Sequence, residues 1–131
     1  MDLIPISPEY YDFVRLLRMH PETKGGFLEE ANITSEQQVK YMEKYSENYF
    51  VCLSYNEPVG YVGVIDGDIR ICTAPDHSCK GVGRFMLREI MCLFPHAAGK
   101  IKKDNIASKK LFDKCKVPYT IIWKLLNTIP T

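Results

Sequence analysis

One stretch of the chain, residues 66–84, restricts the fold more than any other, because it passes from a strand pattern through a loop into a helix pattern. Residues 69–73 are rich in β-branched side chains and alternate in character, as in a strand. Residues 74–77 break that pattern, and the sequence Lys-Gly-Val-Gly-Arg at residues 80–84 leads into apolar residues at helical spacing. Unpaired backbone N–H groups at such a helix start attract anions. The stretch therefore predicts a strand, a phosphate-binding turn and a helix in succession.

The residues before this stretch predict two helices and a set of antiparallel strands. Residues 2–6 favour a short strand, and residues 7–9 have the order of an N-cap, a first-turn proline and a first-turn acid, so a helix should follow and end before Pro21. Residues 34–37 form a capping-box pattern that predicts a second helix ending near Ser46. Strand patterns then follow at residues 49–53, 59–65 and 68–73, and turn residues separate them.

The residues after this stretch predict two helices that alternate with two strands. Apolar side chains at helical spacing run from Gly81 to Phe94, and Pro95 ends the pattern. Residues 99–103 suit a short strand that runs parallel to a neighbour, because a helix separates it from the preceding strand. A fourth helix should begin after Asn105 and extend to Cys115, and residues 119–125 favour a final strand.

Composition limits the classes of protein that this chain can represent. The 131 residues, 46% hydrophobic and 25% charged, predict one soluble domain that spans residues 1–131. The net charge is only +1, with no apolar run of about 20 residues, so we expect neither a nucleic-acid nor a membrane partner. Five cysteines without a C-x-x-C pair, and a start without a signal-peptide pattern, favour a reducing cytoplasmic location.

The order of these elements, with Ser-Cys-Lys-Gly-Val-Gly-Arg at residues 78–84 and Asn-Ile-Ala-Ser at residues 105–108, resembles the GNAT superfamily of acyl-coenzyme A-dependent N-acyltransferases. The resemblance covers nearly the whole chain. It implies an α/β (α+β) fold in which a central, mostly antiparallel sheet contains one parallel, splayed pair of strands and carries helices on both faces. It also implies acetyl-CoA as the acyl donor and a small-molecule amine as the acceptor.

The resemblance implies which residues hold the acyl donor. The glycine loop and the helix start would bind the pyrophosphate of coenzyme A, the strand before them would offer backbone groups to the pantetheine arm, and the Asn-x-x-Ser element would lie near the reactive end. Ser78 stands where the family commonly has Arg or Gln, so a hydroxyl replaces a cation or an amide. The expected cofactor-binding residues are Ile71, Cys72, Thr73, Ser78, Cys79, Lys80, Gly81, Val82, Gly83, Arg84, Asn105 and Ser108.

Direct acyl transfer needs a base for the amine and a proton for the departing thiolate. The resemblance places the base near the beginning of the central strand, where Asp68 is the available carboxylate; Asp66 and His20 are alternatives. Both aspartates also suit a hairpin turn, and His20 suits a helix end. Phe112 stands where the family often has a tyrosine acid, so the proton would come from Tyr119, another hydroxyl or water, unless the thiolate leaves unassisted.

Two cysteines lie in or next to the expected donor site. At Cys72 or Thr73, a backbone N–H is expected to polarise the thioester carbonyl. Cys79, beside Lys80 at a helix start, has features of a nucleophile, although lining the phosphate cradle suits it better. His77 and Cys79 alone make a poor zinc site, so no metal is expected.

The function predicted from these features is N-acetyl transfer from acetyl-CoA to a primary amine of a small molecule such as an amino sugar or a nucleotide-linked sugar. The alternatives are a protein N-acetyltransferase and a module that keeps the fold and binds a cofactor or partner without turnover, which Ser78 and Phe112 would explain. Relatives commonly have two strands where only sixteen residues follow Cys115. We therefore expect an acceptor pocket that is open or is completed by a second subunit in a homodimer.

Overall fold

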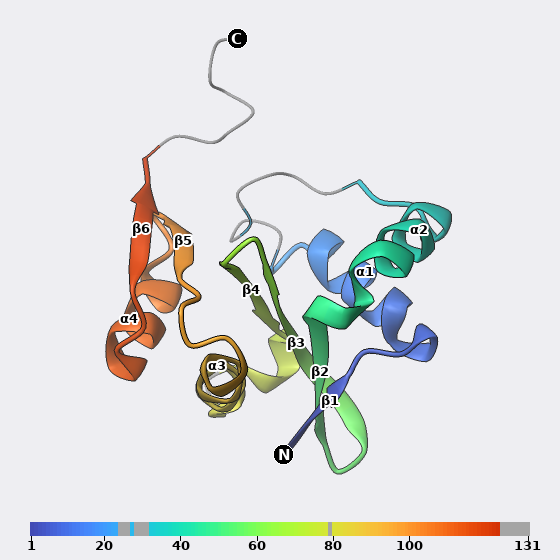
Figure 1. Ribbon diagram of the computed structural model, residues 1–131, viewed down its shortest axis with the longest axis horizontal. Coiled ribbons are helices and arrows are strands. Elements are labelled where there is room, and N and C mark those ends of the chain that lie inside the picture. Colours follow the sequence, from blue (N-terminus) through green and yellow to red (C-terminus); the bar gives the residue numbers. More distant parts are fainter. Residues whose placement is uncertain (24–26, 28–31, 79, 124–131) are drawn as a thin grey trace, which may run out of the picture.

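A computed structural model of the chain describes residues 1–23, 27, 32–78 and 80–123 (Figure 1). Helices and strands alternate along it much as the sequence predicts. In chain order the elements are β1 (Asp2–Pro5), the 3-10 turn η1 (Pro8–Tyr10), α1 (Tyr11–Met19), α2 (Ser35–Tyr45), η3 (Ser46–Asn48), β2 (Tyr49–Ser54), β3 (Glu57–Ile65), β4 (Asp68–Thr73), η4 (Pro75–His77), α3 (Val82–Leu93), β5 (Gly99–Lys102), α4 (Ile106–Cys115) and β6 (Tyr119–Ile122).

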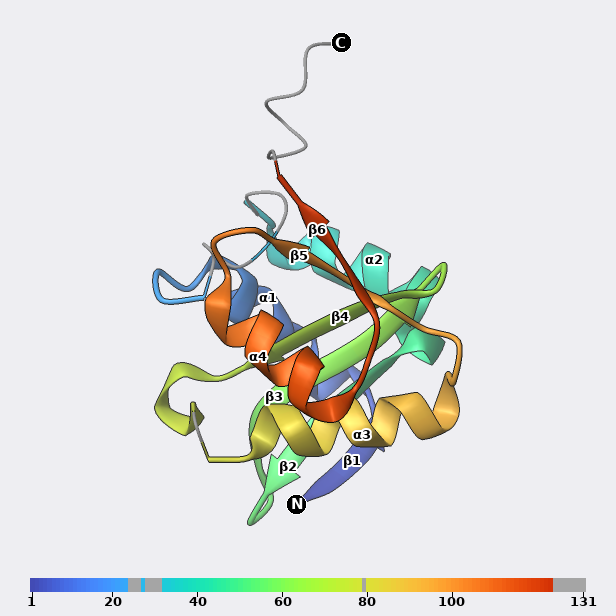
Figure 2. The same ribbon diagram turned by 90° about the vertical axis from the view of Figure 1, so that its left-hand side faces the viewer.

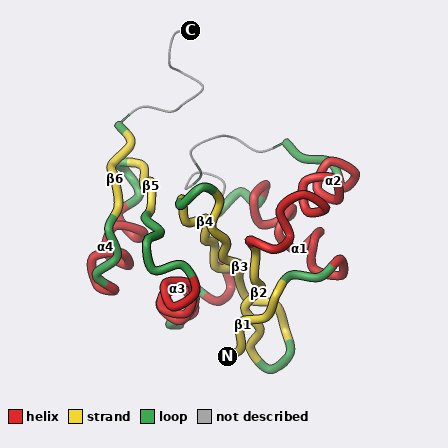
Figure 3. Tube along the Cα trace, viewed as in Figure 1, coloured by secondary structure: helices red, strands yellow, loops and turns green. Residues whose placement is uncertain are grey.

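Four strands form an antiparallel sheet in the order β1-β2-β3-β4 (Figure 3). The β2–β3 and β3–β4 turns each contain two residues with positive φ, Tyr55 and Asn56 at 50° and 65° and Asp66 and Gly67 at 51° and 81°. These angles match the twist of a hairpin. The predicted run of antiparallel strands is confirmed, but β3 begins at Glu57 rather than at residue 59, because the turn before it needs only two residues.

Two further strands, β5 and β6, pair in parallel beside the main sheet. Among the described residues, a single isolated bridge, between Asp68 and Ala98, joins the start of β4 to the β5 side, and beyond it β4 and β5 diverge (Figure 1). The parallel, splayed pair expected from the resemblance is therefore present. Both outer strands are shorter than predicted: β5 ends at Lys102 and β6 at Ile122, where its partner also ends, while residues 124 and 125 lie outside the described residues.

Helices cover both faces of the sheet: α1 and α2 lie on one side, and α3 and α4 lie on the other (Figures 1 and 2). The predicted capping box at the start of α2 is confirmed, because the Thr34 hydroxyl accepts the Gln37 N–H at 3.1 Å and the Gln37 side chain accepts the Thr34 N–H at 2.9 Å. Ser7 behaves differently, since its hydroxyl donates to the Glu9 carboxylate at 2.9 Å instead of capping the backbone. The chain then makes the turn η1 before α1.

The sheet separates two apolar cores. Val62 and Val64 of β3 face α3 and pack with its buried side chains, whereas Tyr61 and Ile65 of the same strand face α1 and α2. Alternation of side chains along a strand explains this division. A side chain on β3 or β4 therefore contributes to only one side of the sheet. The exception is a residue at the open edge of β4.

Candidate acyl-transfer site

A groove of about 1010 Å³ runs along the edge of β4, between the start of α3 and the start of α4. Its lining brings together most of the residues that the sequence predicted to hold coenzyme A. They come from three separate segments of the chain, and they are Ile71, Cys72, Thr73, Ser78, Gly81, Gly83, Arg84, Asn105 and Ser108.

The loop before α3 forms a cradle for an anion. Gly81 has φ +82°, a left-handed conformation that suits glycine, and nothing lies within 4 Å of the place where its side chain would begin. Gly81 also begins α3 without a side-chain cap, and its carbonyl accepts the Phe85 N–H at 3.0 Å. The first N–H groups of a helix have no partner within it and carry partial positive charge. These features fit a pyrophosphate.

The other predicted loop residues have different positions. Lys80 is exposed and Val82 is 4% exposed in the core, and neither side chain is among the described lining of the groove. The Val82 backbone N–H still belongs to the first turn of α3. Cys79, with its competing nucleophile and cradle interpretations, lies outside the described residues.

The open edge of β4 presents backbone groups to the groove. The Ile69 N–H donates to the Ala98 carbonyl at 2.9 Å on the β5 side. Backbone groups alternate in direction along an antiparallel strand, so the N–H groups of Ile71 and Thr73 also point toward β5, where β4 and β5 have already diverged. By the same alternation the Cys72 N–H points toward β3, as does the Ala74 N–H, which donates to the Val59 carbonyl at 2.8 Å. The amide expected of Cys72 in the gap is therefore supplied by Ile71 instead, beside Thr73.

The Cys72 side chain is a protonated thiol in this setting. Burial raises its pKa to about 12, against a smaller lowering by a hydrogen bond from Thr23 and by the charge of Arg18. A thiol needs a lowered pKa to act as a nucleophile at neutral pH. Cys72 is therefore a wall of the groove and is unsuited to covalent catalysis.

The start of α4 closes the far side of the groove. The Asn105 side chain caps the helix by accepting the Ser108 N–H at 3.1 Å, as its sequence context predicts. Gly83 of α3 lets the two helices approach, because a side chain there would begin 3.1 Å from Leu111. This packing places the Asn-x-x-Ser element opposite the edge of β4.

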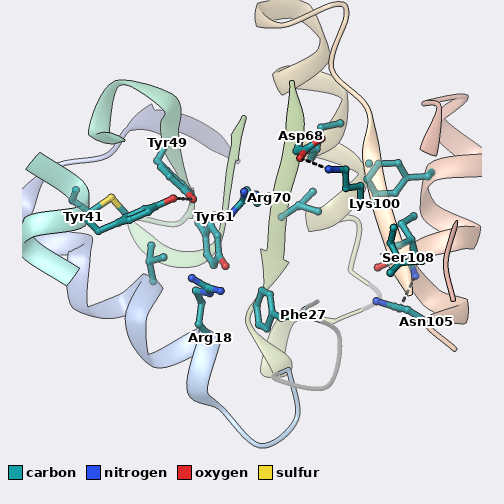
Figure 4. Close-up of a pocket in the computed structure, with 18 of the residues that line it drawn as sticks. Arg18, Phe27, Tyr41, Tyr49, Tyr61, Asp68, Arg70, Lys100, Asn105 and Ser108 are labelled. Carbon is teal, nitrogen blue, oxygen red and sulfur yellow. Dashed lines mark hydrogen bonds and ion pairs between the residues drawn. The ribbon is translucent and has the colours of Figure 1, made fainter. Parts of the chain in front are cut away.

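A second cavity, of about 360 Å³, adjoins the groove where β4 and β5 diverge (Figure 4). The two share the residues Phe27, Ile71, Asn105, Ser108 and Ile122. Beyond this junction the cavity extends to α1, α2 and the start of β2. The side chains that line that far part include Arg18, Gln38, Tyr41, Met42, Tyr49, Tyr61 and Arg70.

Asp68 is the predicted catalytic residue that the structure brings into this cavity. Its carboxylate accepts an ion pair from Lys100 at 2.9 Å, across the gap between β4 and β5 (Figure 4). Asp66, its alternative, lies in the β3–β4 turn with φ 51°. Lys100 is not simply a solvated strand residue, as a surface pattern would indicate, because it meets the candidate base.

The other two catalytic candidates lie elsewhere. His20 ends α1, and its Nδ1 accepts the Glu22 N–H at 3.1 Å. The Tyr119 hydroxyl donates to Asp113 at 2.8 Å, and this hydrogen bond is the main reason that its pKa is raised. Neither residue is among the described lining of the groove or of the cavity.

Sequence reasoning missed a group of tyrosines on the wall of the cavity. The hydroxyls of Tyr41 and Tyr49 meet at 2.7 Å, and burial raises the pKa of Tyr49. Gly63 makes room for the Tyr49 ring, since a side chain at Gly63 would begin 2.6 Å from that ring. The sequence signals this arrangement only by the alternation of side chains along the strands and by the glycine at residue 63. Neither signal reveals that α2 supplies Tyr41.

The described part of the chain contains no group of three or more His, Cys, Asp or Glu side chains placed to hold a metal ion. None of its helices combines the length and the apolar character needed to cross a membrane.

The chain has the fold of solved N-acetyltransferase structures, so the fold expected from the GNAT resemblance is confirmed. The chain matches no protein-family model and no curated protein sequence. The similarity is therefore carried by solved structures.

Spermidine N-acetyltransferase from Vibrio cholerae, solved with CoA and spermine, superimposes with a TM-score of 0.76 and 16% identity over 87% of this chain and 78% of its own. Ribosomal-protein-alanine N-acetyltransferase from Brucella melitensis gives a TM-score of 0.74 and 15% identity, over 87% and 82%. The yncA structure from Salmonella typhimurium, which holds its cofactor acetyl-CoA, gives 0.74 and 15%, over 87% and 77%. At these identities the likeness establishes the fold, and the reaction must be argued from the site.

Proposed function

We propose that this protein is an N-acetyltransferase that moves an acetyl group from acetyl-CoA directly to the primary amine of a small molecule. The observation that carries the proposal is the junction of the groove with the cavity at Ile71, Asn105 and Ser108. A donor lying in the groove and an acceptor lying in the cavity would meet at this point. Holding two reactants in contact supplies much of the rate of such a transfer.

The residues of the groove fit coenzyme A. Gly81, Gly83 and the first N–H groups of α3 would hold the pyrophosphate, and the side chain of Arg84 adds a positive charge at the same place. The N–H groups of Ile71 and Thr73 would hold the pantetheine arm and the thioester carbonyl. Acetyl-CoA supplies an activated acyl group, and hydrogen bonds to its carbonyl stabilise the charge that develops there during attack.

Asp68 is the residue to which we assign the role of base. It would accept a proton from the acceptor ammonium, directly or through a water molecule, so that the free amine can form the new N–C bond as the C–S bond breaks. Lys100 holds the carboxylate in position. The thiolate that leaves would take its proton from water, since the Tyr119 hydroxyl is engaged with Asp113.

The acceptor is proposed to be a small molecule such as an amino sugar or a nucleotide-linked sugar. The enclosed volume of about 360 Å³ supports a compact acceptor more than a folded protein chain. The solved relatives are named for different acceptors, spermidine in one case and a ribosomal protein alanine in another. Protein acetylation therefore remains the alternative to test.

Calorimetry with acetyl-CoA, followed by thiol release across a panel of amines and peptides, tests the proposal. We expect binding in the micromolar range and release of thiol that depends on a small amine. No binding at tens of micromolar would remove the whole class of function. Tight binding without amine-dependent release would favour a module that binds its cofactor without turnover, and release with peptides alone would favour the protein acceptor.

A further inference from the structure

The acceptor cavity carries more positive than negative charge. Its described lining includes three cations, Arg18, Arg70 and Lys100, against one carboxylate, Asp68. Lys100 and Asp68 neutralise each other at 2.9 Å. The other ion pair in the described part of the chain joins Arg15 to Asp12, so Arg18 and Arg70 have no carboxylate among the described residues. Arg18 lies over the Phe27 ring, 5.3 Å from its centroid, and Arg70 is exposed. Neither contact neutralises a charge, so among the described residues the cavity keeps two guanidinium groups without a carboxylate partner.

These two arginines act on the same space although they come from distant parts of the chain. Arg18 belongs to the last turn of α1, and Arg70 lies on the face of β4 that looks toward α1 and α2. Figure 4 shows the ring of Tyr61 between them. Burial raises the pKa of Tyr61 well above its ordinary value, and the charges of Arg18 and Arg70 both oppose that rise. The charges of both arginines therefore reach the buried tyrosine, as they also reach Tyr49.

Tyr61 supplies a third donor to this space. The residue is 2% exposed, and its hydroxyl has no hydrogen-bond partner among the described residues. In Figure 4 the hydroxyl points toward the side chain of Arg18. No described side-chain N or O atom is buried without a partner, so the Tyr61 hydroxyl is open to the cavity that this residue lines. The raised pKa keeps the phenol protonated, and it can therefore donate a hydrogen bond to an acceptor oxygen in the cavity.

We propose that the acceptor amine carries a phosphate group, and that Arg18, Arg70 and the Tyr61 hydroxyl bind that phosphate. The inference rests on the proposed acetyl transfer and specifies its substrate class. Two guanidinium groups and a hydroxyl on three different elements surround a space, rather than forming one flat fork for a carboxylate. A phosphate monoester offers nearly two negative charges and three acceptor oxygens.

The same charges discriminate against a polyamine. A polycation such as spermine, which accompanies CoA in the Vibrio cholerae structure, would meet two guanidinium groups here without a free carboxylate in the described lining. Like charges in a partly enclosed cavity repel more strongly than in water. This chain and that enzyme thus share a fold, while the described charges of this cavity favour an acceptor of opposite sign.

Calorimetry on the protein saturated with coenzyme A tests the inference with a matched set of amines. The probes are glucosamine 6-phosphate, glucosamine, glucosaminic acid and spermidine. We expect the phosphorylated amine to bind at least tenfold more tightly than glucosamine, and this difference to shrink as ionic strength rises. Equal affinity for glucosamine and its phosphate, preference for spermidine, or no detectable binding of any probe would overturn the proposal. Stronger binding of glucosaminic acid would replace phosphate by carboxylate.

Variants of the three donors assign the phosphate to this part of the cavity. Arg18→Gln or Arg70→Gln should weaken binding of glucosamine 6-phosphate about 10- to 100-fold, and Tyr61→Phe should weaken it a few-fold, with unchanged affinity for coenzyme A. Arg18→Lys should keep part of the affinity because it keeps the charge. Arg88→Gln is the matched control, since Arg88 is exposed on α3 and outside both described linings. An equal loss in the control would contradict the assignment.

Thiol release from acetyl-CoA, measured with the same amines and variants, separates this inference from the proposed function. Phosphate-selective binding without thiol release would leave the anion site standing and remove the acetyl transfer. Thiol release that is equally fast with glucosamine, its phosphate and spermidine would support the transfer and overturn the phosphate site.

Discussion

The groove and the acceptor cavity are built in opposite ways. The groove is formed largely by backbone, since Gly81, the start of α3 and the open edge of β4 present N–H groups along it. The cavity is formed by side chains that α1, α2, α4 and the strands β2 to β6 bring together, with Arg18, Tyr61 and Arg70 at its far end. A site built from backbone groups can bind the same ligand in proteins of different sequence, whereas a site built from side chains binds a ligand that depends on the sequence. If the groove holds the donor and the cavity the acceptor, as proposed, we expect donor binding to depend mainly on backbone and acceptor choice mainly on the side chains of this chain.

The largest expected effect is the loss of kcat on replacing Asp68, the proposed base. Asp68→Asn should lower kcat by about 100-fold or more, because general bases contribute about 10²–10⁴, while affinity for coenzyme A stays unchanged. Steady-state kinetics at several pH values measure this, and higher pH should restore part of the rate by deprotonating the acceptor. Lys100→Met breaks the same ion pair but keeps the carboxylate. An equal loss in that control would show that the ion pair itself, rather than a base, is needed.

The next effect separates the two faces of β3. Gly63→Ala would place a methyl group 2.6 Å from the Tyr49 ring and 2.8 Å from the Asn48 carbonyl, which should destabilise the fold by about 1–3 kcal/mol and raise KM for the acceptor. Gly60→Ala is equally crowded, at 2.8 Å from Met86 on the α3 face. Denaturant unfolding and kinetics should show similar losses of stability, but a higher acceptor KM in the first variant alone. The same KM in both would mean that Tyr49 does not shape the cavity.

A pair of glycines with the same backbone conformation tests the cradle. Gly81→Ala and Gly67→Ala both force a side chain into positive φ, at +82° and +81°, with open space around it. Each should cost about 1–2 kcal/mol of strain, but only Gly81→Ala should weaken coenzyme A binding, about tenfold by calorimetry. Gly67 lies in the β3–β4 turn, outside both described linings. Weaker binding in both variants would attribute the effect to general loss of stability.

Two helix caps of similar strength should have different functional effects. Thr34→Ala and Asn105→Ala each remove a side-chain acceptor for a backbone N–H at 3.1 Å, and each should cost about 1 kcal/mol. Thermal unfolding measures this loss. Because α2 supplies Tyr41 and α4 borders the groove, the first variant should affect the acceptor KM and the second coenzyme A affinity. The reverse pattern would contradict the division of roles.

The smallest expected effect is the pH dependence that the Cys72 thiol gives to the stability of the fold. The pKa of Cys72 is raised to about 12 by burial, whereas an unfolded thiol titrates near about 8.5. The folded state therefore keeps the proton longer, so this contribution to stability is complete below about pH 8.5 and is lost as pH rises toward 12. Alkylation by iodoacetamide at pH 9, followed by mass spectrometry, should label exposed Cys92 at least tenfold faster than Cys72. Equal rates would mean that Cys72 is solvated.

The sequence by itself determined the elements whose signals are local. Thr34 with Gln37, Asp66 with Gly67, and Asn105 with Ser108 each act within four residues, so the caps and the turn could be predicted and are observed. Side-chain spacing alone could not give the ends of β5 and β6, because each strand ends where its partner ends.

The tertiary structure alone decided the acceptor cavity. Arg18 and Arg70 are separated by fifty-two positions in the sequence, and Lys100 is a further thirty away from Arg70; no local pattern relates them. Packing of α1 and α2 on one face of the sheet places Arg18 beside Tyr61, and the divergence of β4 from β5 brings Lys100 to Asp68. Local propensities act over a few residues, whereas charge complementarity to a ligand depends on side chains that only the folded chain assembles.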